Sequence, residues 1–213
     1  IKIENYENAS QYNQENVEHF TVASGLSDNT VYAFRMSRYS PILWIGSNGP
    51  GLDYYSYDDK KIHTLKNNTR TRFTEVHCIL EESDSILWVA SLYSLLKVSI
   101  DKKCNIPETN NIRRYEFNTG NKKLSNQIYS ICQENDSILW LSMRGNGAIR
   151  LNSISGDYEH ITFEREGIAP MNDILSVYID KNNNKWFGSS YGINSITQIT
   201  DKTIEYKSFN END

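Results

Sequence analysis

Residues with catalytic or metal-binding chemistry lie along this sequence without the spacing that such chemistry needs. The four histidines include no pair at zinc-ligand spacing, and no serine stands in a Gly-x-Ser-x-Gly pattern. The run from Asp180 begins like a calcium loop, but Lys185 and Tyr191 occupy the positions that require Gly and Glu. Asp173 flanks an expected strand where a lyase or glycosidase would need convergent acids, and it has no evident partner. We therefore predict a chain that is not an enzyme and holds no cofactor or metal.

Six polar or aromatic residues are candidates for ligand binding. Amides, a guanidinium and tyrosine rings suit a sugar, since hydroxyl groups need polar partners and pyranose rings stack on aromatic faces. The candidates are Asn48, Arg70, Tyr93, Arg144, Asn146 and Tyr191. For each of them, a structural role in a turn is the competing interpretation.

The elements that would position these residues follow from the tryptophans. All four tryptophans, Trp44, Trp88, Trp140 and Trp186, lie 44, 52 and 46 residues apart. An aliphatic residue that opens an alternating run precedes each one by 13 or 12 positions: Val31, Val76, Ile128 and Ile174. Self-similarity at this period is typical of solenoids and propellers. The identical place of the tryptophans in inner strands predicts that they pack between repeats and do not stack on a ligand.

Each repeat contains four short apolar or alternating runs separated by polar turns, which indicates four antiparallel strands. Such a repeat is a propeller blade, so we predict an all-β fold. The expected complete blades are residues 26–65, 74–117, 124–163 and 172–209, and residues 1–22 form a half blade that supplies a third and fourth strand. The insertion 102–111 is expected to be a surface loop between the third and fourth strands of the second blade.

The half blade supplies two strands and the four complete blades supply sixteen, and this set of strands does not close a propeller ring. We expect an open arc of about four and a half blades from a larger, seven-bladed propeller. Apolar faces at both ends would be covered by the missing blades or by a second copy. The chain begins with Ile1, without Met or a signal sequence, and is expected to be a piece of a longer protein.

Composition excludes several classes of function. The net charge of −5 and the absence of Lys/Arg clusters argue against nucleic-acid binding. No apolar run is long enough to span a bilayer, so no membrane contact by this segment is expected. The cysteines, Cys78, Cys104 and Cys132, have no metal or redox spacing. Cys78 and Cys132 lie in expected first strands and are predicted to be small buried residues.

The repeat resembles the two-component regulator propeller repeat. The likeness is clearest in Leu26-Ser-Asp-Asn with Leu43-Trp-Ile-Gly-Ser47, and in Leu124-Ser-Asn with Leu139-Trp-Leu-Ser142. The second copy departs from it, with Thr74-Glu75 at its corner and Ala90 in place of Gly, which leaves its loop conformation open. The resemblance implies the periplasmic sensor region of hybrid histidine kinases that regulate polysaccharide use.

Three hypotheses follow for the function. The first is a non-catalytic periplasmic sensor module of a membrane-anchored receptor. It would respond to an oligosaccharide, with the missing blades and neighbouring domains of the receptor as its partners. The second is a scaffold that packs against other blades and forms a homodimer while recognition occurs elsewhere. The third, and least favoured, is a propeller lyase or glycosidase.

Overall fold

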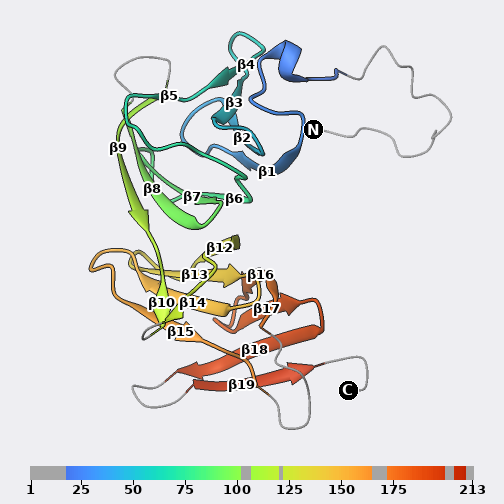
Figure 1. Ribbon diagram of the computed structural model, residues 1–213, viewed down its shortest axis with the longest axis vertical. Coiled ribbons are helices and arrows are strands. Elements are labelled where there is room, and N and C mark those ends of the chain that lie inside the picture. The colour runs from blue at the N-terminus through green and yellow to red at the C-terminus, as the bar shows by residue number, and fades with distance from the viewer. Residues whose placement is uncertain (1–17, 102–106, 120–121, 165–171, 200–203, 210–213) are drawn as a thin grey trace, which may run out of the picture.

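The computed structural model describes residues 18–101, 107–119, 122–164, 172–199 and 204–209. Its regular structure consists of strands and one 3₁₀ turn, η2 (Val22–Ser24) (Figure 1). Four antiparallel four-stranded sheets follow one another along the chain as the blades of a propeller arc, here called blades 1 to 4.

The strands of each blade pair in the order in which they occur in the chain. Blade 1 contains β1 (Val31–Met36), β2 (Ile42–Ser47), β3 (Leu52–Ser56) and β4 (Lys61–Thr64). Blade 2 contains β6 (Cys78–Glu81), β7 (Ile86–Ser91), β8 (Ser94–Asp101) and β9 (Glu108–Tyr115). Blade 3 contains β12 (Ile128–Gln133), β13 (Ile138–Met143), β14 (Gly147–Asn152) and β15 (Tyr158–Ile161). Blade 4 contains β16 (Ile174–Ile179), β17 (Lys185–Ser189), β18 (Gly192–Ile199) and β19 (Ile204–Phe209).

Three short strands lie between the blades. β5 (Lys66–Asn67) pairs in parallel with β9 and adds a fifth strand to the sheet of blade 2. β10 (Asn118–Thr119) and β11 (Lys122–Lys123) form a two-stranded hairpin between blades 2 and 3.

Burial explains why the second strand of each repeat is so apolar. Every residue of β13 is buried, and so are all residues of β7 except its first, because neighbouring blades cover both faces of these strands. The outer strands β4 and β15 are mostly exposed and carry polar residues. Near its start, the first strand of blades 1, 3 and 4 has a bulge. The recurrence of this bulge at one repeat position shows that it belongs to the blade design.

The core is divided among the blade interfaces. Trp44 of blade 1 shares a buried cluster with Leu87 of blade 2. Trp88 packs with Leu139 of blade 3, and Trp140 packs with Phe187 of blade 4. Each of these three indoles therefore fills the space between its own blade and the next one. Trp186 of the last blade is half-buried.

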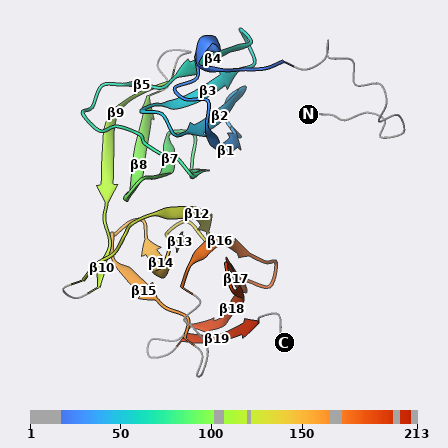
Figure 2. The ribbon, with the colours of Figure 1, turned by 45° about the vertical axis from the view of Figure 1, so that its right-hand side comes forward.

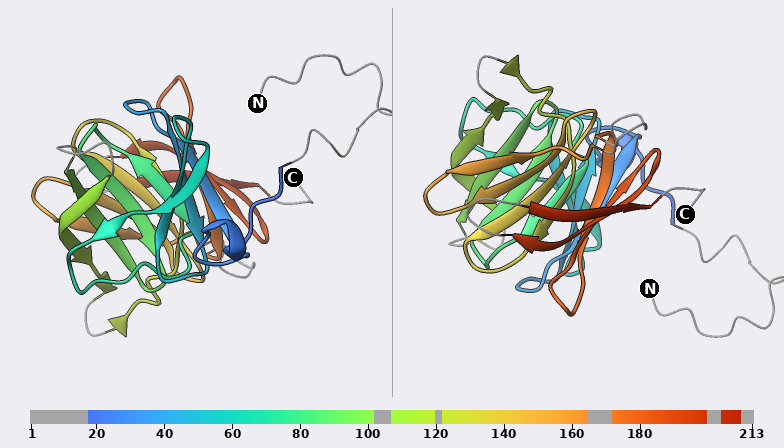
Figure 3. Two further views of the ribbon diagram at one scale, coloured as in Figure 1. Left: turned by 90° about the horizontal axis from the view of Figure 1, so that it is seen from above. Right: turned by 90° about the horizontal axis from the view of Figure 1, so that it is seen from below.

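The blades form an arc in which their first strands are innermost. β1 lies beside β6, β6 beside β12, and β12 beside β16. Figure 2 shows β12 at the boundary between blades 1 and 2 above and blades 3 and 4 below. Seen along the long axis, the sheets lie one over another (Figure 3).

Two sequence expectations are corrected by the strands. The half blade of residues 1–22 lies mostly outside the described residues, but residues 18–21 form no strand and Val22 begins η2. There Phe20 packs edge-on against Tyr55 of blade 1, with ring centroids 5.5 Å apart, and does not join a sheet. The expected loop 102–111 is in part a strand, because β9 already begins at Glu108 and its residues pair with those of β8.

An acidic side chain six residues before the tryptophan holds the indole in three blades. The Trp88 Nε1–H donates to Glu82, the Trp140 Nε1–H to Glu134 at 2.7 Å, and the Trp186 Nε1–H to Asp180 at 2.9 Å. We call these contacts the indole–acid pairs. The sequence carries a signal for this pairing, since the residue six positions before Trp88, Trp140 and Trp186 is acidic in each case.

The pair in blade 4 predicts a pH dependence of stability. Hydrogen bonds from Trp186 and Asn184 lower the pKa of Asp180 from the usual 3.8 to about 2. The folded chain therefore binds the Asp180 proton less readily than the unfolded chain, so the carboxylate contributes stability above pH 3.8 that is lost as the pH falls through about 2. We expect Asp180→Asn to flatten the pH dependence of urea unfolding over this interval. Asp136→Asn, at an exposed turn of blade 3, is the control that should leave the profile unchanged.

Candidate functional site

Five of the six candidate residues lie in the turns between the second and third strands of their blades, here called the loop face, and Arg70 lies in the connection after β5. Asn48, Arg70 and Arg144 are exposed, Asn146 is half-buried, and Tyr93 and Tyr191 are 52% and 62% exposed. Tyr93 has a left-handed backbone, with φ of 64°. The structure brings two of the six together, since Arg144 and Asn146 share the turn between β13 and β14.

Local hydrogen bonds brace this turn in blade 3. The Asn146 amide Nδ2 donates to the Ser125 hydroxyl and to the Arg144 carbonyl, both at 2.8 Å. The carbonyl oxygen of Asn146 lies 2.7 Å from Nε2 of His160. These contacts are those of a residue that fixes its own loop, so the geometry favours a structural role for the Asn146 side chain.

Asp173 joins the loops of two blades. One carboxylate oxygen accepts from the Gly145 N–H of blade 3 at 3.1 Å, and the other accepts from the Ser190 hydroxyl of blade 4 at 2.9 Å. The acid that lacked an evident partner in the sequence thus has two partners in the fold. Both are structural, so Asp173 braces the loop face.

The degenerate corner of the second repeat differs from the corner of the third, because its left-handed residue stands 13 positions before the tryptophan instead of 14. Glu75 and Asn126 both have left-handed backbones, with φ of 45° and 56°. The fully buried Asn126 also bonds to the backbone of Phe117 and Leu124. The change of sequence at the second corner is thus accompanied by a shift of the left-handed residue by one position.

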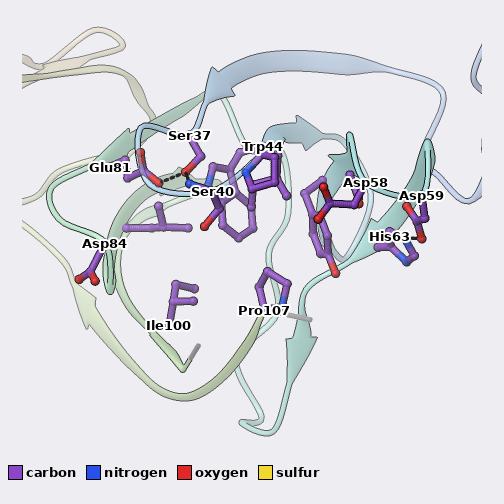
Figure 4. A pocket seen from close by; sticks show the side chains of 15 residues that line it. Ser37, Ser40, Trp44, Asp58, Asp59, His63, Glu81, Asp84, Ile100 and Pro107 are labelled. Atoms are coloured by element: carbon purple, nitrogen blue, oxygen red, sulfur yellow. Dashed lines mark hydrogen bonds and ion pairs between the residues drawn. The ribbon is translucent and has the colours of Figure 1, made fainter. Parts of the chain in front are cut away.

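A pocket lies between blades 1 and 2, lined by none of the six candidates, and we call it the inter-blade pocket. It has a volume of about 460 Å³. Its walls come from the β1–β2 turn, the β3–β4 turn, the β6–β7 turn and the ends of β8 and β9 (Figure 4). The lining residues are Ser37, Ser40, Pro41, Ile42, Trp44, Tyr54, Ser56, Asp58, Asp59, His63, Glu81, Asp84, Leu87, Ile100 and Pro107.

One wall of the pocket is fixed by a contact between blades. Glu81 of β6 is 4% exposed, and its carboxylate accepts from the Ser37 hydroxyl and from the Arg38 N–H, both at 2.7 Å. Ser37 and Arg38 belong to the turn of blade 1, so this acid ties the two blades together. Charged acceptors form the stronger kind of hydrogen bond, and the wall is accordingly well anchored.

The opposite wall is an aromatic stack closed by an ion pair. The ring of Tyr54 lies edge-on to Trp44 at 5.6 Å and is stacked on His63 at 5.3 Å. Nε2 of His63 is 2.8 Å from Oδ2 of Asp59. Burial, helped by the nearby Asp59 charge, raises the pKa of Tyr54, so its hydroxyl stays protonated and can donate.

Carboxylates give the pocket a negative potential. Asp58, Asp59, Glu81 and Asp84 line it, and His63 is the only lining residue that could carry a positive charge. Burial raises the pKa of Asp59, but hydrogen bonds from Ser56 and His63 outweigh that effect and lower it overall. Asp59 is therefore ionised at neutral pH and cannot be a general acid of the kind that glycosidases use.

The described residues contain no group of three or more His, Cys, Asp or Glu side chains that could hold a metal ion. Within the same residues, no helix has the length and apolar character to cross a bilayer. The side chains that line the inter-blade pocket present hydrogen-bonding groups, carboxylates and aromatic rings.

The fold and these loops define the class of the chain, an arc of a β-propeller. No family model matches the sequence. The chain is homologous to a part of histidine kinase P4 of Formosa agariphila, with 29% identity over 189 residues, which is 86% of this chain and 13% of that protein.

Solved propellers share the fold. The extracellular domain of a hybrid two-component system of Bacteroides thetaiotaomicron superposes with a TM-score of 0.64 and 20% identity over 84% of this chain and 24% of that one. A second such domain from this bacterium superposes with a TM-score of 0.66 and 16% identity, over 87% of this chain and 25% of that one. A virginiamycin B lyase from Staphylococcus aureus superposes with a TM-score of 0.62 and 16% identity, over 87% of this chain and 57% of that one. These similarities confirm the prediction of an all-β propeller arc.

Proposed function

We propose that this chain is part of the periplasmic sensor region of a membrane-anchored hybrid histidine kinase and responds to an oligosaccharide released from a larger glycan. The observation that carries the proposal is the homology to histidine kinase P4 over 86% of the chain. The propeller folds of two extracellular domains of hybrid two-component systems support it. The chain spans about an eighth of its curated relative and about a quarter of those domains, so further blades and domains of the receptor are its proposed partners.

Within this receptor the chain itself is proposed to be non-catalytic. The likeness to a lyase shows only a shared fold, since one fold carries many functions. Asp173, the acid best placed for lyase or glycosidase chemistry in the sequence, has both oxygens engaged in bracing loops. Glu81 likewise has both oxygens engaged between blades.

Exposed apolar side chains favour a second, compatible role as a scaffold. On the first strands of the two outermost blades, Phe34 is 66% exposed and Tyr178 is 65% exposed. Met36 and Leu175, at 51% and 45%, extend these surfaces. Apolar surface of this kind is covered when a further blade or a second copy packs against it. In the scaffold role, the chain joins blades or forms a dimer, while the ligand binds elsewhere.

A signalling assay of the complete receptor tests the sensor role. We expect defined oligosaccharides to raise kinase output and the melting temperature of the whole extracellular region, because a ligand that binds only the folded state stabilises it. The proposal fails if no member of a broad glycan panel changes either measurement.

The Arg144→Ala/Asn146→Ala variant separates the two roles. If the loop face binds the ligand, the response should fall at least about tenfold, because polar contacts to a ligand contribute on the order of 1 to 3 kcal/mol. A folded receptor with an unchanged response would assign these residues to the scaffold.

A further inference from the structure

Blade 1 lacks the indole–acid pair that the other three blades have. By backbone pairing, the counterpart of Glu82, Glu134 and Asp180 in blade 1 is Ser37, because its N–H donates to the Ile42 carbonyl as theirs do to the carbonyls of Ile86, Ile138 and Asn184. The β1–β2 turn is one residue longer than the others, so Ser37 stands seven positions before Trp44. The blade therefore has the donor of the pair without its usual acceptor.

The consequence is an indole N–H with no partner. Trp44 is 2% exposed, and no group in the described part of the chain accepts a hydrogen bond from its Nε1. An unsatisfied buried donor costs about 1 to 3 kcal/mol, so its retention calls for an explanation. Trp44 lines the inter-blade pocket, where Figure 4 shows its ring between Ser37 and Glu81 on one side and Asp58, Asp59 and His63 on the other.

We propose that the inter-blade pocket binds a small, hydroxyl-rich ligand that carries no negative charge, with an oxygen of the ligand accepting the Trp44 indole N–H. The N–H requires an acceptor, while the carboxylates around it require donors. A hydroxyl group meets both requirements, because it donates one hydrogen bond and accepts two.

Charge decides against an anionic ligand. Four carboxylates line the pocket against one histidine, and Asp58 and Asp84 are exposed acids without a hydrogen bond to the rest of the described chain. These two keep full capacity to accept from a ligand hydroxyl or ammonium group. A ligand carboxylate or sulfate would be repelled by them, since like charges about 4 Å apart cost on the order of 1 to 4 kcal/mol near a protein surface.

The rest of the lining fits the carbon skeleton of such a ligand. Ile42, Leu87, Ile100 and Pro107 give apolar surface, and the aromatic pair of Trp44 and Tyr54 adds ring faces. Pockets that bind small molecules combine such apolar walls with a few placed polar groups, and their volumes begin at about 300 Å³. At about 460 Å³ the inter-blade pocket suits a ligand of one or two sugar-sized rings.

This inference depends on the geometry of the pocket and not on the proposed receptor role. The experiment below measures binding to the chain alone, so its failure leaves the signalling proposal standing. A receptor that failed to signal would likewise not contradict ligand binding in the inter-blade pocket.

The four indole N–H groups are separate probes of binding. We would record ¹H–¹⁵N spectra of the 213-residue chain, assign the Trp44 peak with Trp44→Phe, and titrate D-glucosamine, D-glucose and D-glucuronate in turn. These three probes share a ring and differ in charge. We expect a saturable shift of the Trp44 peak with D-glucosamine and D-glucose, the former binding more tightly, and at least about tenfold weaker binding of D-glucuronate.

Substitutions test whether the shift of the Trp44 peak arises from binding in the inter-blade pocket. Ser37→Gln supplies an amide oxygen as acceptor at the position that is acidic in the other blades, so the Trp44 peak should move toward the other three indole peaks and lose its response to D-glucosamine. Asp84→Asn should weaken D-glucosamine binding about threefold, and Asp136→Asn at the same turn position of blade 3 should not.

Three results would overturn the proposal. The first is a Trp44 peak that none of the three probes shifts, as for an indole that is merely hydrated. The second is equal binding of D-glucuronate and D-glucose, and the third is an equal response of all four indole peaks.

Discussion

Replacing Trp140 by Ala is expected to lower the free energy of unfolding by about 3 to 5 kcal/mol, which is the cost of removing a fully buried large aromatic side chain. Trp140 is 0% exposed and packs edge-on against Phe187 of the next blade, with ring centroids 5.5 Å apart. The substitution removes contacts on both sides of an interface and also takes the indole donor away from Glu134. Urea unfolding at neutral pH measures the loss.

Trp186→Ala is the matched control for this prediction. Trp186 holds the same repeat position in blade 4, and its indole also donates to an acid, but it is half-buried. Since the cost of truncation follows burial, we expect about half the loss seen at Trp140. Equal losses at the two positions would show that the indoles act within their own blade and would contradict the assignment of the core to blade interfaces.

The propeller architecture could be predicted from the sequence because its signals are local and repeated. The period of the tryptophans and the alternation in the strands are local signals that recur four times, so each copy supports the interpretation of the others. A strand pattern that has no neighbouring strand to pair with is weaker evidence for a β-strand. Residues 18–21 were expected to be in a strand, yet nothing in the described chain pairs with them and Phe20 packs on Tyr55.

The candidate sites were harder to predict because their geometry depends on pairs of residues from different blades. The bond between Ser37 and Glu81 joins residues 44 positions apart, and no local pattern indicates it. The unpaired indole of Trp44 could have been found by comparing the residue six places before each tryptophan. Arg144 and Asn146 were selected for their types alone, and the bracing of Asn146 by Ser125 appears only when the turn is folded.

The same comparison among repeats indicates how the blades divide their tasks. Where the acid is present, it fixes the indole and, in blade 3, reaches across to the next blade. In blade 1 the corresponding residue is Ser37, the turn is held by Glu81 from the following blade, and a pocket lies beside the unpaired indole. Repeat proteins can vary one copy at little cost to the others, since each repeat contacts only its neighbours. The proposed binding in the inter-blade pocket would therefore use the one blade whose turn lacks the acid.

Replacing Lys185 by Met is expected to cost about 3 to 5 kcal/mol, because it leaves a largely buried carboxylate without its cation. Nζ of Lys185 in blade 4 lies 2.7 Å from Oε1 of Glu134 in blade 3, and the two side chains are only 8% and 13% exposed. Burial of Glu134 favours its neutral form, but the bonds from Lys185 and Trp140 outweigh burial and lower its pKa below the usual 4.5. The pair therefore stabilises the folded chain above pH 4.5, and this contribution is lost as the pH falls through the lowered pKa.

The Lys185→Met variant should also reverse the pH dependence of the stability of the folded chain. Without Lys185, burial becomes a dominant influence on Glu134 and raises its pKa, so stability should increase as the pH is lowered from 7 toward 5. Lys97→Met is the control, since Lys97 is 3.8 Å from Glu82, both side chains are more exposed, and an exposed pair contributes less than about 1 kcal/mol. Lys185→Met/Glu134→Gln should recover part of the loss, because the buried charge is then gone. A loss at Lys185 no larger than that at Lys97 would mean that this ion pair does not hold blades 3 and 4 together.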